Sequence, residues 1–359
     1  MWYLIYVYCN NINKNKMNKT KLKNSKILVT GGAGFIGSNL IERFLEQNNE
    51  VVCLDNLSTG HRKNIIPFLE NKNFQFIEGD IRNLETCRIA VRDCEYVFHQ
   101  AALGSVPRSI KDPATTNSVN IDGFLNMLIA SRDEAVKRFI YAASSSTYGD
   151  SKEVPKIEER FGRPLSPYAI TKVVNEYFAK VFSELYGMET IGLRYFNVFG
   201  KRQDPNGAYA AVIPLWVKQF INYESPVING DGSYSRDFTY IENVIHANEQ
   251  AAIIKKDEYF RNLKSYFSNY ENPFVNEVFN VAFGDNTTLN QLFDYLKMNL
   301  TKYDSEINKV EPIYGPNRNG DIPHSLASIE KGKAVLKYNP QIDAKKGFDL
   351  VCEWYFKNF

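Results

Sequence analysis

The sequence predicts an α/β protein, with a doubly wound parallel sheet followed by a smaller, mixed C-terminal region. Three observations support this prediction. Short apolar runs alternate with segments of helical periodicity as far as residue 193. A glycine-rich turn separates the first apolar run from the first helix. The alternation then ends at about residue 197, which marks the limit of the regular sheet.

The predicted strands are the apolar runs, which lie at residues 26–29, 51–54, 74–77, 96–99, 138–142 and 190–193. Helical periodicity marks the segments between them, at 35–46, 122–131 and 167–186. Strands that alternate with helices at this spacing are typical of a parallel sheet with helices on both faces.

The remaining chain is less regular. Helices are predicted at 289–300 and 331–336, and the charged, aromatic segment 255–276 is predicted to be an insertion because it has no clear period. We therefore divide the chain into a tail (1–25), a sheet domain (26–197) and a mixed region (198–359) from which strands can return to the sheet.

The tail begins with an apolar run at 1–9, followed by an Asn/Lys-rich stretch. The run is too short to span a bilayer. Its charges follow the apolar residues rather than precede them, which argues against a signal peptide. We expect a tail without function, with Met17 as an alternative start; the alternative is a short element that packs on the sheet domain.

Composition excludes several classes of function. Hydrophobic residues make up 44% and charged residues 23% of the 359 residues, as in ordinary globular proteins. The net charge of +2 gives no basic field for a nucleic acid, so neither a nucleic-acid nor a membrane partner is expected. The four histidines and five cysteines show no metal-ligand spacing, so no metal is expected. The cysteines are scattered and their number is odd, which favours a reducing, cytoplasmic location.

The glycine-rich turn has the spacing Gly31-x-x-Gly34-x-x-Gly37. Only glycine lets the backbone approach a pyrophosphate this closely, and the following helix supplies N–H donors and its dipole. Asp55 closes the next strand, where a carboxylate accepts a hydrogen bond from a ribose 2′-hydroxyl and repels a 2′-phosphate. The pattern predicts NAD rather than NADP; the alternative is a turn that binds nothing.

Tyr168 and Lys172 are four residues apart, so they share one face of a helix. An ammonium beside a phenol lowers the pKa of the phenol and makes it a base for a hydroxyl proton. Ser144 follows the fifth strand and can donate to the same substrate oxygen, although serines after a strand usually form only a turn. With a nicotinamide site, these residues predict hydride chemistry at an alcohol carbon.

Together the motifs resemble those of the extended short-chain dehydrogenase/reductase family of nucleotide-sugar enzymes, from residue 26 to the C-terminus. The segments that carry the resemblance are 30–37, 55–60, 99–102, 144–149, 168–172 and 194–200, joined in the C-terminal half by 230–232, 236–238 and 318–323. The resemblance implies a Rossmann sheet with NAD, a cofactor domain at 26–197 and a mainly substrate-binding domain at 198–359.

Within that family the chain resembles the UDP-hexose 4-epimerases, in the branch that acts on UDP-N-acetylglucosamine and UDP-N-acetylgalactosamine. Ser144 takes the position of the family's catalytic serine or threonine. Dehydratases of the family carry an Asp-Glu pair directly after it, and UDP-glucuronate decarboxylases carry a glutamate. This chain has Ser145 and Ser146 there instead, so the resemblance implies epimerisation.

The site residues follow from the pattern and the resemblance. Ser144, Tyr168 and Lys172 are the expected catalytic group. Tyr168 and Lys172 are also expected to contact the cofactor. The other expected cofactor contacts are Gly31, Gly34, Phe35, Ile36, Gly37, Asp55, Asn56, Leu57, Ser58, Thr59, Gly60, Asp80, Ile81, Gln100, Ala101, Ala102 and Tyr195. For Asp80 the alternative is a helix cap.

The resemblance implies a substrate site that shares Ser144 and Tyr168 and adds Ser105, Ser145, Ser146, Asn197, Val212, Pro214, Trp216, Asn229, Arg236, Arg318, Asp321 and Ser325. The two arginines suit a diphosphate because their donors are forked and their charge is permanent; a surface salt bridge is the alternative. Trp216 is the residue for which simple core packing competes with uracil binding. Family members restricted to glucose and galactose carry a bulky tyrosine where this chain has Ser325, which implies space for an N-acetyl group.

The expected function is reversible C4 epimerisation of UDP-N-acetylglucosamine, with activity on UDP-glucose as an extension, through a 4-keto intermediate and bound NAD. Alternatives are a UDP-glucuronate 4-epimerase and a non-catalytic NAD-binding scaffold. The resemblance also implies a homodimer formed through a helix pair, with the helix of Tyr168 as one candidate, and a role in polysaccharide biosynthesis.

Overall fold

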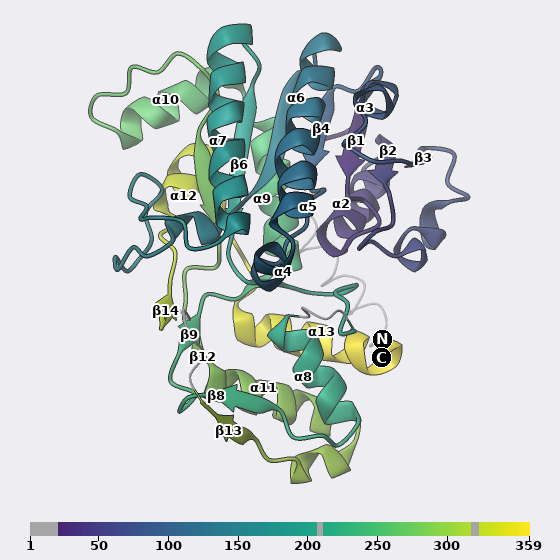
Figure 1. Ribbon diagram of the computed structural model, residues 1–359, viewed down its shortest axis with the longest axis vertical. Helices are drawn as coiled ribbons and strands as arrows, with labels where there is room; N and C mark the ends of the chain where they lie inside the picture. Colours follow the sequence, from purple (N-terminus) through teal and green to yellow (C-terminus); the bar gives the residue numbers. More distant parts are fainter. Residues whose placement is uncertain (1–20, 207–210, 317–322) are drawn as a thin grey trace, which may run out of the picture.

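The computed structural model describes residues 21–206, 211–316 and 323–359. A parallel sheet of seven strands forms the upper part in Figure 1, in the order β11-β6-β5-β4-β1-β2-β3. Its strands are β1 (Lys26–Thr30), β2 (Glu50–Asp55), β3 (Phe74–Glu78), β4 (Tyr96–His99), β5 (Arg138–Ser144), β6 (Thr190–Tyr195) and β11 (Val278–Val281). The six predicted strands and the parallel α/β class are confirmed, and β11 returns to the sheet from the mixed region.

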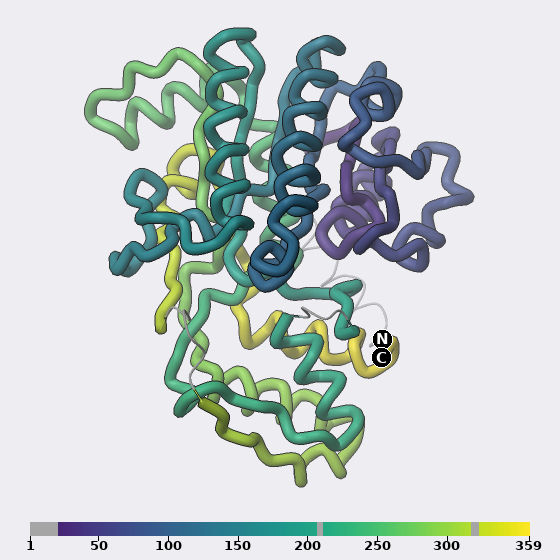
Figure 2. Tube along the Cα trace, in the orientation of Figure 1, coloured from purple at the N-terminus to yellow at the C-terminus, as the bar shows by residue number. Residues whose placement is uncertain are grey.

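Helices cover both faces of this sheet. On one face lie α3 (Leu84–Val91), α6 (Gly123–Asp133) and α7 (Pro167–Tyr186); on the other, α2 (Phe35–Glu46) packs against α9 (Ile241–Ile253). Side-chain alternation in β1 shows the division, because Ile27 and Val29 join the core under α2 and α9, whereas Leu28 joins the core under α3, α6 and α7. The tube view in Figure 2 shows the long, side-by-side course of α6 and α7.

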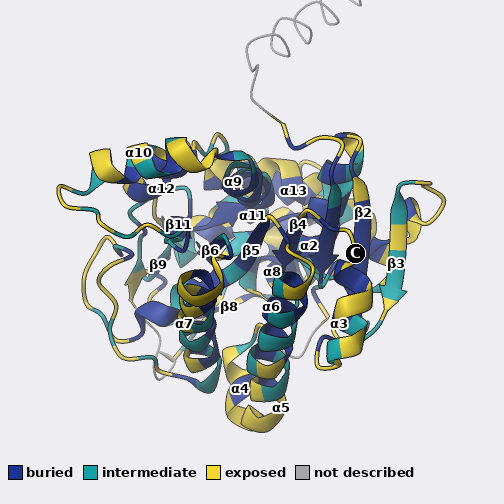
Figure 3. Cartoon of the chain, turned by 90° about the horizontal axis from the view of Figure 1, so that it is seen from above, coloured by how far each residue is buried: buried dark blue, intermediate teal, exposed yellow. Residues whose placement is uncertain are grey.

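Shorter elements lie around the edge of the sheet. Two small helices, α4 (Val106–Lys111) and α5 (Pro113–Asn117), precede a π-helical turn (Ser118–Asp122) that leads into α6. The predicted insertion contains α10 (Lys256–Tyr266), which packs on α12 (Glu330–Leu336). Figure 3 shows α4, α5 and α10 as largely exposed. Only Tyr259 and Leu263 of α10 are buried, so the helix has a narrow apolar face on a largely polar sequence.

The lower part in Figure 1 contains α8 (Val212–Ile221), α11 (Leu289–Thr301) and α13 (Ala344–Asn358), which pack together. Three small sheets accompany them: β10 (Thr239–Tyr240) with β7 (Val198–Phe199), β13 (Ile313–Gly315) with β8 (Val227–Asn229), and β9 (Ser235–Arg236) between β12 (Thr287–Thr288) and β14 (His324–Ser325). A capping box at Thr288 and Gln291 starts α11, which agrees with the predicted helix.

The buried carboxylate of Asp237 joins this lower part to the end of the large sheet. Its oxygens accept hydrogen bonds from the backbone N–H groups of Phe283, Gly284 and Ala327. Burial raises the pKa of Asp237 to about 7. One side chain therefore fixes two loops, one after β11 and one after β14, against β9.

Asp237→Ala should lower the free energy of unfolding by about 3 kcal/mol or more, because it leaves buried N–H donors without an acceptor. Asp237→Asn keeps one acceptor oxygen, so its free energy of unfolding should lie between those of the wild type and Asp237→Ala. Urea unfolding followed by circular dichroism measures both. The control is Asp349→Ala, which removes an exposed ion pair to Lys302 and should cost less than about 1 kcal/mol. A loss for Asp237→Ala no larger than in this control would contradict the assignment.

Candidate active site

A cavity of about 340 Å³ lies outside the carboxyl ends of β1, β2 and β4. The strand order reverses between β1 and β4, which is where doubly wound sheets bind their ligands. Predicted cofactor residues that line the cavity are Gly31, Gly34, Phe35, Ile36, Gly37, Asp55, Asn56, Ser58, Thr59, Gly60, Asp80, Ile81, Gln100, Ala101 and Ala102. Five further residues line it and were not predicted, namely Leu54, Gly79, Leu103, Gly104 and Val119. Three of them are ordinary apolar residues that no polar or glycine motif marks.

The glycine turn is shaped for a close approach. Gly31 has φ +67°, and a Cβ there would lie 2.8 Å from the backbone of Ala101. A Cβ on Gly37 would lie 2.2 Å from the carbonyl oxygen of Gly31. Helix α2 starts directly after Gly34, which has no side chain to cap the helix. The first N–H groups of α2 therefore face the cavity without a side-chain acceptor. This arrangement suits an anionic pyrophosphate.

Asp55 ends β2 at the edge of the cavity. Its carboxylate accepts hydrogen bonds from the backbone N–H groups of Ala33 (2.9 Å) and Leu57 (2.8 Å). Burial raises the pKa of Asp55 above its ordinary value. Because these two bonds fix the carboxylate and each oxygen keeps a further acceptor position, the residue can also receive a ribose hydroxyl.

Asp80 pairs with Arg82, which with Asn56 holds its pKa at about 2. The alternative of a helix cap is wrong, because the N-cap of α3 is Asn83.

The predicted catalytic residues lie at the C-terminal end of β5 and in the first turns of α7. Ser144 is the last residue of β5, and its Oγ accepts from the backbone N–H and the hydroxyl of Ser146. Tyr168 lies in the first turn of α7, whose N-cap is Ser166. A hydrogen bond with Ser144 lowers the pKa of Tyr168, but burial has the larger effect and raises it above the ordinary value.

Lys172 does not lower the pKa of Tyr168 in this structure, which differs from the sequence-based expectation. Its ammonium donates to the carbonyl oxygen of Ala142 at 2.6 Å and lies 6.0 Å from the centre of the Tyr168 ring. Burial lowers the pKa of Lys172 itself to about 8. Spacing along the helix places the two residues correctly, but it does not reveal the competing backbone acceptor or the desolvation of both groups.

Tyr195 does not line the cavity but supports a residue that does. Its hydroxyl donates to Gln100 Oε1 at 3.1 Å, while Gln100 Nε2 is buried and has no hydrogen-bond partner among the described residues. A ligand that offers an acceptor at this point would satisfy Gln100. His99, next to it, contacts Thr30 Oγ1 through Nδ1 at 2.9 Å, and burial lowers its pKa to about 3. Tyr195 and His99 both lie next to the predicted Gln100-Ala101-Ala102 segment, and this segment was the sequence signal that pointed to them.

The predicted substrate residues fall into three groups. Arg236 on β9 is in register with Ser325 on β14, and Asn197, at φ +35°, donates to the carbonyl oxygen of Asp237. Ser105, Ser145 and Ser146 lie on the side of β4 and β5, where Ser105 caps α4. The remaining residues lie on or next to α8 and β8, namely Val212, Pro214, Trp216 and Asn229. Arg318 and Asp321 lie outside the described residues.

Trp216 is 3% exposed and packs edge-to-face on Phe293 in the hydrophobic core. Its packing therefore agrees with the core alternative. Leu57 packs against the core beside the turn and is not among the residues that line the cavity.

Within the described residues, no helix is long and apolar enough to cross a membrane, and no group of three or more His, Cys, Asp or Glu side chains could hold a metal ion. Taken together, the glycine turn, Asp55 and the unsatisfied amide of Gln100 fit a dinucleotide such as NAD.

Comparison with known proteins agrees. Residues 27–258 match the NAD dependent epimerase/dehydratase family. A putative UDP-glucose 4-epimerase of Methanocaldococcus jannaschii is 36% identical over 92% of this chain and 99% of its own length.

Two solved structures are similar throughout. The UDP-N-acetylglucosamine 4-epimerase of Methanobrevibacter ruminantium M1, in complex with UDP-N-acetylmuramic acid, has a TM-score of 0.83 and 36% identity over 94% of this chain and 100% of that one. The UDP-glucuronic acid 4-epimerase of Bacillus cereus, in complex with UDP-glucuronic acid and NAD, has a TM-score of 0.77 and 28% identity over 93% and 100%. The chain therefore belongs to the NAD dependent epimerase/dehydratase family, and it is an NAD-dependent UDP-sugar 4-epimerase.

Proposed function

We propose that the enzyme interconverts UDP-N-acetylglucosamine and UDP-N-acetylgalactosamine, and that UDP-glucose and UDP-galactose are secondary substrates. The observation that carries the proposal is the small side chain of Ser325, which is half-buried on β14 beside Arg236 on β9. If Arg236 binds the diphosphate, Ser325 on the neighbouring strand is close to the attached sugar. A side chain at this position would then limit the size of the sugar that fits. The relative from Methanobrevibacter ruminantium supports the same substrate class.

In the proposed mechanism, Tyr168 removes the proton from the 4-hydroxyl of the sugar, and Ser144 donates to the same oxygen. Ser144 is near enough to Tyr168 to lower its pKa, which suits two groups that act on one substrate oxygen. Bound NAD⁺ supplies the hydride acceptor, and its positive nicotinamide charge favours the phenolate. Lys172, held by the Ala142 carbonyl, is proposed to bind the ribose hydroxyls.

Epimerisation requires the 4-keto sugar to present its other face before the hydride returns. Arg236 is proposed to hold the diphosphate during this rotation, with Arg318 as its partner. Asn197 is proposed to hold the sugar and diphosphate, and Val212, Pro214, Trp216 and Asn229 the uridine side. On the cofactor side, Asp55 is proposed to bind the adenosine ribose, which excludes a 2′-phosphate.

A homodimer and a cytoplasmic location are part of the proposal. Helix α7 exposes Ile170, Tyr177, Val181 and Leu185, which are 44% to 70% exposed. A second copy would remove this apolar surface from water. The four cysteines among the described residues are all free and buried, which suits a reducing compartment. The pathway served is proposed to be polysaccharide biosynthesis.

UDP-glucuronate 4-epimerisation is a second candidate, favoured by the Bacillus cereus structure. It needs a cationic or amide-rich pocket for the C6 carboxylate. Turnover of UDP-glucuronate, assayed beside the four neutral UDP-sugars, decides between the two candidates.

Ser325→Tyr should fill the space beside the sugar C2 group. Overpacking of this kind costs on the order of 1–3 kcal/mol, so kcat/KM for UDP-N-acetylglucosamine should fall about ten- to a hundredfold relative to that for UDP-glucose. Ser325→Ala is the matched control and should leave the ratio of the two constants unchanged. If the tyrosine variant also leaves the ratio unchanged, Ser325 does not line the C2 pocket.

Tyr168→Phe should bind UDP-sugar normally and lose turnover by at least about a hundredfold, because the phenolic oxygen is the proposed acid/base group. Binding can be measured by calorimetry and turnover by a coupled assay. Tyr177→Phe removes a hydroxyl from an exposed tyrosine on the same helix and should remain fully active. Near-normal turnover of Tyr168→Phe would overturn the assigned role.

A further inference from the structure

Two segments that are far apart in the sequence meet beside the cofactor cavity. One is the run 56–60, which lines the cavity over most of its length, followed by His61. The other is the segment 201–206, which leads from β7 toward α8. They are joined by a contact of 3.0 Å between His61 Nε2 and Asp204 Oδ2, and both side chains are partly exposed.

The run 56–60 is held at its two ends by backbone contacts. At its start, Leu57 N–H donates to Asp55. At its far end, His61 N–H donates to the carbonyl oxygen of Ala33 at 2.9 Å. Gly60 is packed so closely there that a Cβ would lie 2.9 Å from the Ala33 carbonyl carbon. The run can therefore move away from the cavity only if its His61 end moves as well.

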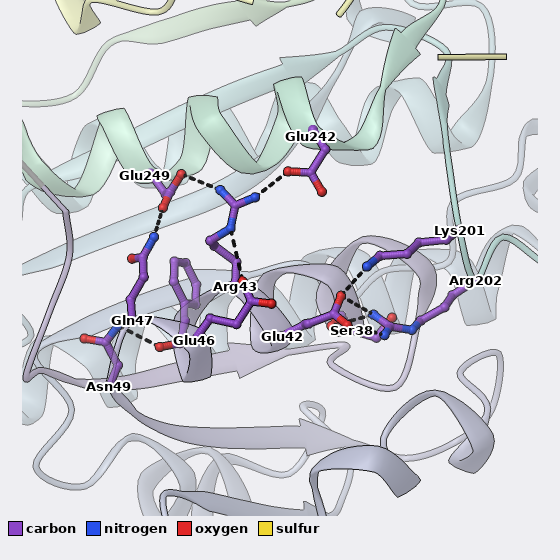
Figure 4. A network of polar contacts seen from close by, with 11 residues as sticks. Ser38, Glu42, Arg43, Glu46, Gln47, Asn49, Lys201, Arg202, Glu242 and Glu249 are labelled. Carbon is purple, nitrogen blue, oxygen red and sulfur yellow. Dashed lines mark hydrogen bonds and ion pairs between the residues drawn. The ribbon is translucent and has the colours of Figure 1, made fainter. Parts of the chain in front are cut away.

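Asp204 lies on a segment that is anchored elsewhere, on helix α2. Figure 4 shows Glu42 of α2 between Lys201 and Arg202, and it contacts both. Arg202 also donates to the carbonyl oxygen of Ser38, and Asn39 Nδ2 donates to that of Lys201 at 3.1 Å. These contacts do not involve the run 56–60.

Helix α2 is itself fixed on its other side. Arg43 pairs with Glu242 and Glu249 of α9, and Gln47 donates to Glu249, as Figure 4 also shows. Asp204 is thus attached to helices α2 and α9 through several polar contacts, whereas His61 directly follows a run that lines the cofactor cavity.

We propose that His61 and Asp204 form a latch that keeps the run 56–60 closed over NAD and so slows the release of the cofactor. The latch holds whichever UDP-sugar is the substrate. Both residues act as positioning residues, because neither lines the cavity. Slow release suits a reaction that takes a hydride from the substrate and returns it, since the same cofactor then serves every turnover.

Charge alone predicts the opposite effect for Asp204. Removing a carboxylate near an anionic pyrophosphate reduces repulsion and would slow the release. The latch predicts faster release. The direction of the change therefore separates the two explanations.

The test uses the full-length enzyme loaded with radiolabelled NAD, desalted, and chased with excess unlabelled NAD at fixed pH. Retained label is followed with time for the wild type, His61→Phe, Asp204→Asn and the double variant. His61→Phe keeps the ring volume and the backbone N–H to Ala33, and Asp204→Asn keeps an acceptor for the turn at Asn206. The control is Asp349→Asn, which loses the exposed ion pair to Lys302, the residue that follows α11.

Each single variant should release NAD at least about fivefold faster, as expected for one charge-assisted hydrogen bond. The double variant should be no faster than the faster single variant, because both changes break the same contact. Melting temperatures should change no more than in Asp349→Asn. Release at the wild-type rate in both single variants would overturn the latch. Effects that multiply in the double variant, or that also appear in the control, would overturn it as well.

Discussion

A turn with no room for a side chain is the constraint on which the cofactor half of the protein depends. At Gly37 an added Cβ would lie 2.2 Å from the oxygen of Gly31, so the end of β1 and the start of α2 touch backbone to backbone. This contact sets the direction in which α2 leaves the sheet. Its N-terminus is then aimed at the cavity, and the carboxyl ends of β2 and β4 complete the walls. Only glycine satisfies this geometry, at some cost in chain entropy.

The C-terminal part of the chain depends on buried side chains that bind backbone groups of distant loops. Asp237 holds the loops after β11 and β14. Asn280 on β11 does similar work, since it donates to the carbonyl oxygens of Lys156 and Ser328 and accepts from Tyr148. The turn after Ser144 and the strand of Ser325 are thereby tied to the same strand of the large sheet. The position of Ser144 relative to Ser325 is therefore set by buried polar bonds, which require specific geometry.

The sequence was informative where local chemistry dictates structure. Each of the six strands predicted from apolar runs exists. Five of them are buried along most of their length, and a strand buried on both faces is apolar at nearly every position. The sixth, β3, lies at the edge of the sheet and is only partly buried. The glycine turn and Asp55 were placed correctly for the same reason, since backbone conformation and strand position fix them locally. Helix α9 was not predicted. Its buried residues include the polar Asn243, Asn248 and Glu249, so apolar residues alone do not mark its buried face. The pKa of Tyr168 and the core packing of Trp216 depend on tertiary surroundings that no local pattern encodes.

The path of the chain has a consequence for how this protein could be shortened or recombined. After β6 the chain leaves the sheet, returns as α9 to pack on α2, leaves again, and returns as β11 beside β6. A gene fragment that ends near residue 197 would encode the whole glycine turn and the Tyr168 helix, yet it would expose the hydrogen-bonding edge of β6 and the apolar face under α9. Such a fragment would tend to aggregate and would not fold as an independent domain. Evolution of this enzyme by exchanging its whole C-terminal region is therefore restricted, and change is easier at single half-buried positions such as Ser325 on β14.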